Sequence, residues 1–160
     1  MNEFSKNKTW EEAQQEYVLP YFKQILNCNI QPSTFDDDVK NATDLILEYQ
    51  GNFIKCGLRI RDVKYMQYND ITIRSRSKHG NLTEIDKLKN TDRIIYCVVN
   101  PLNKKVMKYA ILDALATYNL LTKLSCLEEI QNKNAGTWFM AIPIDLARDN
   151  QLITKEHGFI

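Results

Sequence analysis

The sequence predicts an α/β (α+β) fold: a single compact domain, residues 1–160, with a central mixed β-sheet flanked by helices. Three observations lead to this prediction. Apolar residues recur at helical spacing near the N-terminus, strand-like runs separated by turn residues fill the middle, and a helical stretch precedes one more strand. A chain of this length with no repeat or linker is typical of one domain.

The first helix is predicted to begin at Thr9, because Thr9 and Glu12 match a capping box. Apolar residues then recur at helical spacing: Trp10, Ala13, Tyr17 and Val18. Pro20 is expected to kink or restart the helix, which should continue to about Asn27. A loop at residues 32–33 and a short helix capped by Thr34 are expected next.

Six stretches have the composition of strands: residues 44–49, 53–61, 71–77, 93–100, 106–113 and 136–143. Gly51 and Asn52 predict a turn between the first two. The run "RIIYCVVN" is hydrophobic almost throughout, which predicts burial on both faces, and the next strand should pair with it as a hairpin. Helical turns are expected at residues 83–88, 114–133 and 144–153, with Asp113 as an N-cap.

Composition excludes several classes of protein. The net charge is +1, so nucleic acid would be bound by local charge patterning and not by the whole molecule. The four cysteines are scattered and there are only two histidines, which predicts reduced, buried thiols and not a zinc site. The sequence lacks a signal peptide, a membrane-length apolar run, a Gly-x-Ser-x-Gly motif and a glycine-rich phosphate loop. A cytoplasmic protein is therefore predicted.

Basic residues alternate along two neighbouring strands. Arg74, Arg76 and Lys78 share one face of the run "ITIRSRSK", and Arg59 and Arg61 share one face of the preceding strand. If these strands pair as a hairpin, the five cations lie side by side. Like charges opposite one another repel, so anions are expected nearby, either protein carboxylates or phosphates.

The charge balance around this face favours an anion site. Residues 53–80 contain seven Lys or Arg and two acids. Tyr65, Met66 and Tyr68 lie in the connection between the two strands and could stack on bases. The alternative is a solvated outer face whose arginines discourage edge-to-edge aggregation.

An acid-bearing helix, an Asp at the start of a strand, a turn and a second strand ending in basic residues resemble the PD-(D/E)XK nuclease superfamily. The segments "NATDLIL", "GLRIRD", "TIRSRS" and "TEIDKL" also look like those of small phage and prophage proteins. The resemblance covers about residues 9–113 and implies a restriction-endonuclease-like architecture.

In that superfamily a helix Glu, a strand Asp and a second-strand acid bind Mg²⁺, while a Lys orients the attacking water. The resemblance implies that Asp44 is the strand Asp and that Glu12 or Glu16 is the helix acid. Asp44 and Glu12 are thus the predicted metal ligands, and with Arg59 they are the candidate catalytic residues.

The sequence departs from the family pattern at the second-strand acid, because the usual Glu-x-Lys spacing falls on Gly57-Leu58-Arg59. An Asp-x-Lys exists at residues 62–64, but it lies at the end of the strand. Two functions therefore stay open within the resemblance: a Mg²⁺-dependent phosphodiesterase, or a nuclease-like fold that binds DNA or RNA without cleavage. The alternative from another class is a phage interaction or inhibitor protein that docks its arginine face on an acidic partner.

Overall fold

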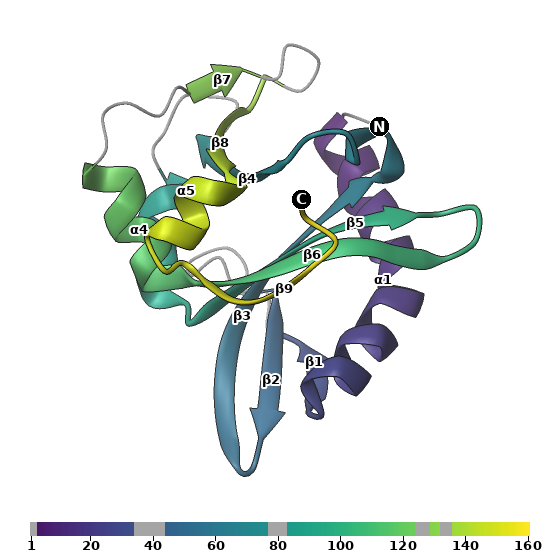
Figure 1. The fold of residues 1–160 in the computed structure, drawn as a ribbon. Coiled ribbons are helices and arrows are strands. Elements are labelled where there is room, and N and C mark those ends of the chain that lie inside the picture. Colours follow the sequence, from purple (N-terminus) through teal and green to yellow (C-terminus); the bar gives the residue numbers. More distant parts are fainter. Residues whose placement is uncertain (1–2, 34–43, 77–82, 124–128, 132–135) are drawn as a thin grey trace.

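The computed structural model of the protein describes residues 3–33, 44–76, 83–123, 129–131 and 136–160 (Figure 1). The predicted α+β class is confirmed. A six-stranded mixed sheet and a three-stranded sheet are flanked, within the described residues, by four α-helices.

The large sheet has the strand order β1-β2-β3-β5-β6-β9. Its strands are β1 (Asn29–Pro32), β2 (Leu45–Tyr49), β3 (Asn52–Asp62), β5 (Arg93–Asn100), β6 (Lys105–Asp113) and β9 (Ile153–His157). Only the β3–β5 pair is parallel. The β2–β3 hairpin projects from the body of the molecule (Figure 1), and its turn places Gln50 at φ 49° and Gly51 at φ 81°. Two positive φ values in succession favour a hairpin turn, and glycine adopts such a value without strain.

The small sheet has the order β4-β8-β7, formed by β4 (Asp70–Arg76), β8 (Trp138–Pro143) and β7 (Glu129–Gln131). The predicted hairpin between β3 and β4 is therefore wrong. β2 pairs with residues 52–56 of β3 and β5 pairs with residues 56–62, while the Asp44 carboxylate accepts from the Leu58 amide of β3. Instead β4 pairs antiparallel with β8, and the two arginine-bearing strands belong to different sheets.

The helices are α1 (Glu3–Leu26), α3 (Thr83–Lys87), α4 (Ala114–Lys123) and α5 (Ile144–Asp149); two short 3-10 turns are η1 (Val63–Tyr65) and η2 (Leu88–Asn90). Helix α1 begins at Glu3, so the predicted start at Thr9 is wrong. The helix continues through Pro20 without restarting. Tertiary contact with the sheet stabilises the helix across the proline. The predicted cap on α4 is confirmed, because the Ala116 amide donates to Asp113 Oδ1 at 2.8 Å.

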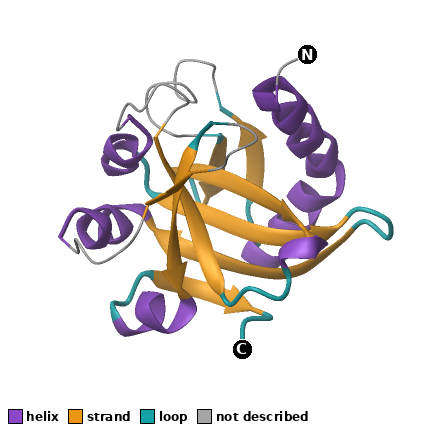
Figure 2. Cartoon of the chain, turned by 90° about the horizontal axis from the view of Figure 1, so that it is seen from above, coloured by secondary structure: helices purple, strands orange, loops and turns teal. Residues whose placement is uncertain are grey.

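Two hydrophobic cores lie on the two faces of the large sheet. Alternate residues of β5 separate them, so Ile95 and Cys97 contact the α1 side while Tyr96 and Val98 contact the side of α3, α4, α5 and the small sheet. Figure 2 shows α1, which begins near the end marked N, on one side of the strands and α3, α4 and α5 on the other. Burial on both faces of this strand, predicted from its continuous hydrophobicity, is confirmed.

Three short strands were not expected. β7 occupies a stretch predicted as helix, whereas β1 overlaps the predicted loop only at Pro32 and β9 overlaps the predicted final helix or turn only at Ile153. All three are edge strands of three to five residues, so pairing with a longer neighbour determines their conformation more than their own sequence does. The predicted short helix after Thr34 lies outside the described residues. No helix in the described part of the chain combines the length and apolar character needed to cross a lipid bilayer.

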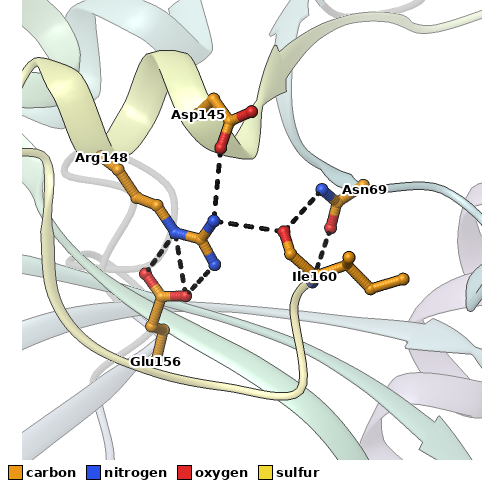
Figure 3. Close-up of polar contacts among 5 residues, drawn as sticks. All are labelled: Asn69, Asp145, Arg148, Glu156 and Ile160. Carbon is orange, nitrogen blue, oxygen red and sulfur yellow. Dashed lines mark hydrogen bonds and ion pairs between the residues drawn. The ribbon is translucent and has the colours of Figure 1, made fainter.

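The chain after β9 is fastened to the connection between β3 and β4 (Figure 3). The Asn69 side chain donates to the Ile160 carbonyl and accepts from the Ile160 amide, both at 3.1 Å. Arg148 Nη1 of α5 also donates to that carbonyl at 3.2 Å. Arg148 Nη2 forms an ion pair with Glu156 Oε1 of β9 at 2.5 Å. These bonds hold the connection next to the body of the protein.

A candidate anion-binding site between the two sheets

Strand alternation directs the arginines of β3 toward the small sheet. Cys56 and Ile60 of β3 pack in the core beneath α1, so Arg59 and Arg61 extend from the opposite face. On β4, Ile71 and Ile73 enter the larger core. The intervening Thr72 faces the two β3 arginines.

The Thr72 hydroxyl is the point at which both arginines meet. Arg59 Nε donates to Thr72 Oγ1 at 3.0 Å, and Arg61 Nη1 donates to the same oxygen at 2.6 Å. Thr72 is 5% exposed, so this oxygen has little access to water. A single neutral acceptor thus holds two positively charged groups.

Tyr96 of β5 lies beside the Thr72 hydroxyl. A hydroxyl offers one donor and two acceptor positions, and the two guanidinium groups occupy both acceptor positions. Burial is the largest influence on the pKa of Tyr96 and raises it, while Arg61, Arg59 and Thr72 act to lower it, so the phenol stays neutral. Residues of three strands, β3, β4 and β5, therefore meet around one hydroxyl.

Repulsion between the arginines is an energetic cost of this arrangement. Two unit charges about 5 Å apart repel by about 3 kcal/mol at an effective dielectric constant of ~20. Burial, together with the charges of Arg61 and Arg74, lowers the pKa of Arg59 to about 10. The nearby carboxylate of Glu11 on α1 acts in the opposite direction on the pKa of Arg59.

Asp70 offers a second carboxylate near the arginines. Burial raises the pKa of Asp70, and the charges of Arg61 and Lys108 oppose that rise. Three guanidinium groups, those of Arg59, Arg61 and Arg74, therefore stand against the two carboxylates of Glu11 and Asp70. We refer to these three arginines as the arginine cluster; among the described residues, the carboxylates whose charges act on Arg59 and Arg61 are those of Glu11 and Asp70.

Arg74 is the arginine of the cluster whose positive charge is least offset by contacts with other described residues. Its charge reaches Arg59, yet within the described residues no hydrogen bond or ion pair joins its side chain to a partner. A register shift between Arg74 and Arg76 also interrupts the strand alternation that predicted a shared face for them. Only the backbone of Arg76 is described, and Lys78 lies outside the described residues.

Aromatic rings adjoin the cluster on one side. The guanidinium carbon of Arg61 lies 3.9 Å from the centroid of the Tyr65 ring, and the Lys64 ammonium lies 5.3 Å from it. The Tyr65 and Tyr68 rings are 6.3 Å apart, and Tyr68 is 51% exposed. Arg61 therefore contacts both Thr72 and the tyrosine pair.

The carboxylates implied by the nuclease resemblance have other surroundings. Asp44 lies directly before β2, where Oδ2 accepts from the Leu58 amide at 2.6 Å. Glu12 and Glu16 are exposed on α1, while their neighbour Glu11 is the acid whose charge reaches Arg59. Asp62 caps η1 by accepting from the Lys64 amide at 3.0 Å, as expected for an acid at the end of the strand.

The described residues do not fit a magnesium centre. Nowhere in the described ranges do three His, Cys, Asp or Glu side chains gather in a way that could hold a metal ion. Gly57 stands where the family has a carboxylate, and Arg59, at the position of the family's lysine, donates to Thr72. The geometry that is present is suited to holding an anion.

Sequence reasoning identified Arg59, Arg61 and Arg74 but missed the groups that bring them together. Thr72 is a small polar residue inside a strand, and Tyr96 lies within an apolar run, so neither gave a functional signal. Glu11 was missed because it shares its helix with Glu12 and Glu16, and their positions in the sequence do not say which of the three is near β3. Asp70 has the clearest local signal, as the last acid before the basic strand.

The protein matches no protein-family model, no curated protein and no solved structure in the three comparisons made.

Proposed function

We propose that the protein binds nucleic acid by holding backbone phosphate at the arginine cluster. The observation that carries this proposal is the convergence of Arg59 and Arg61 on the neutral Thr72 hydroxyl, with Arg74 beside them. An anion that approaches Arg74 relieves repulsion among three arginines, on which the described carboxylates of Glu11 and Asp70 act in the same favourable direction. Guanidinium groups bind phosphate in a planar, two-pronged geometry, which favours phosphate over a spherical anion.

The proposal does not depend on cleavage. The resemblance to nucleases implies a catalytic Mg²⁺ site at Asp44 and Glu12, but the described residues around Asp44 favour a structural role, since its carboxylate accepts from the β3 backbone. Binding without hydrolysis is therefore the function that this geometry supports best.

The test is a salt titration of binding to labelled DNA and RNA oligonucleotides, with Arg74→Ala as the variant. Loss of one charge-assisted phosphate contact should weaken binding by about 1.5–3 kcal/mol, or about 10- to 150-fold. It should also reduce the slope of log K against log salt by about one unit. Arg74 is chosen because its removal leaves the Thr72 bonds intact.

Lys155→Ala is the matched control. Lys155 is exposed on β9, which is separated from β3 by β5 and β6 in the large sheet. The control removes the same unit of charge from a strand that lies about 14 Å from β3, given about 4.8 Å per strand. Equal effects of the two variants would show that net charge and not the cluster drives binding. The same titration with and without Mg²⁺, on Asp44→Asn and the unmodified protein, reports any cleavage.

A further inference from the structure

We infer that Tyr65 and Tyr68 form a stacking platform for unpaired bases, so that the arginine cluster holds a single strand in preference to a duplex. This inference rests on the proposed function, because the platform needs the cluster to bring a nucleotide strand to it.

The platform joins the cluster through Arg61. One guanidinium group donates to Thr72 and lies 3.9 Å over the Tyr65 ring, so phosphate held by the cluster is next to the aromatic pair. A base linked to that phosphate reaches Tyr68 more readily than Tyr65, because Arg61 already covers part of the Tyr65 ring. Half of Tyr68 is exposed, which leaves a ring surface open to a ligand.

The loop that carries the tyrosines is held in place by hydrogen bonds from several directions. The Met66 amide donates to the Val63 carbonyl at 2.9 Å, and the Tyr68 amide donates to the Tyr65 carbonyl at 3.2 Å. From β6, the Lys108 ammonium donates to the Met66 carbonyl at 3.1 Å and to the Tyr68 carbonyl at 2.5 Å. A loop ordered before binding loses less conformational entropy on binding, which favours a recognition role for its exposed ring.

An aromatic platform distinguishes single strands from duplexes by access to the base. In a duplex each base is covered above and below by its neighbours, so a protein ring reaches a base face only where bases are unpaired or splayed out. Stacking tolerates any sequence because every base has an aromatic face. The platform thus predicts a preference for unpaired nucleotides with little preference among sequences.

The experiment compares single-stranded and duplex oligonucleotides of one sequence, as DNA and as RNA, at one fixed salt concentration. Tyr68→Ala should weaken single-strand binding by about 5- to 150-fold, the range for loss of one base–aromatic stack, and leave duplex binding nearly unchanged. Tyr68→Phe keeps the ring and should bind as the unmodified protein does. Phe53→Ala removes a ring that is 71% exposed on the β2–β3 hairpin and should have no effect.

An abasic oligonucleotide, which keeps the phosphates and lacks the bases, tests stacking directly. If Tyr68 stacks on a base, Tyr68→Ala should cost nothing further on the abasic strand, because the contact is already absent. An equal loss on abasic and ordinary strands would overturn the platform.

Arg74→Ala separates this inference from the proposed function. Loss of binding in Arg74→Ala, with Tyr68→Ala binding single strands as well as the unmodified protein, would refute the platform and leave phosphate binding standing. No loss in Arg74→Ala would refute the proposed function, and the inference with it. Matching urea midpoints for the variants and the unmodified protein would show that lost affinity does not come from unfolding.

Discussion

Replacement of Thr72 by valine isolates the hydrogen bonds that gather the arginine cluster. Valine has nearly the shape of threonine, so Thr72→Val removes the hydroxyl without opening a cavity. The bonds from Arg59 and Arg61, at 3.0 and 2.6 Å, are lost together. Both guanidinium groups then lack their shared acceptor.

The magnitude follows from the kind of bond and its access to water. A hydrogen bond to a charged group contributes about 1.5–3 kcal/mol, and a buried group left without a partner retains its desolvation cost. Arg59 and Arg61 are both half-buried, so each guanidinium group can recover part of its hydration when its bond to Thr72 is lost. We expect Thr72→Val to lower the free energy of unfolding by about 2–4 kcal/mol.

The assay is urea unfolding followed by circular dichroism, with Thr72→Ser as the matched control. Serine keeps the hydroxyl and loses one buried methyl group, which should cost about 1 kcal/mol. Valine should therefore be clearly less stable than serine. Should Thr72→Val unfold at the same urea concentration as the unmodified protein, the hydroxyl does not hold the cluster together and the argument built on it is refuted.

Three further predictions concern groups around the cluster. Burial raises the pKa of Asp70 above its ordinary value of 3.8, so the folded protein binds the Asp70 proton more tightly than the unfolded chain does. The stability gained from this protonation is fully present below pH 3.8 and is lost as the pH rises through the raised pKa. Asp70→Asn should accordingly gain stability relative to the unmodified protein between pH 3 and pH 7, and parallel urea midpoints across that range would contradict this. Lys108→Met should lower the free energy of unfolding by about 1–3 kcal/mol, because the Met66 and Tyr68 carbonyls lose their shared donor; urea unfolding measures it, and an unchanged midpoint would show that water replaces the ammonium. Burial raises the pKa of the Cys56 and Cys97 thiols, so neither should react with a maleimide at pH 7.5 until urea is added; mass spectrometry locates the label, and native labelling at either site would mean that the core opens.

Local patterns in the sequence determined most of the secondary structure. β5 was predictable because a short hydrophobic run bounded by polar residues is typical of a buried strand. The β2–β3 turn was predictable because Gly51 tolerates a positive φ. The start of α1 was mistaken because Thr9 matches a capping signal that lies inside a longer helix. A short capping motif does not indicate whether the residues before it are also helical.

The candidate site was predictable only in part for a similar reason. Alternation along β3 determined that Arg59 and Arg61 share a face, since that depends on the strand alone. Which residues contact Arg59 and Arg61 depended on how the strands pair. Arg59 of the large sheet and Thr72 of the small sheet come together only because the two sheets pack against each other. Only the tertiary structure, by pairing β3 with β2 and β5 and pairing β4 with β8, decided that Arg59 and Arg61 meet at a threonine hydroxyl and not in a β3–β4 hairpin. Strand pairing and sheet packing are long-range choices, made by the whole chain as it buries its apolar faces.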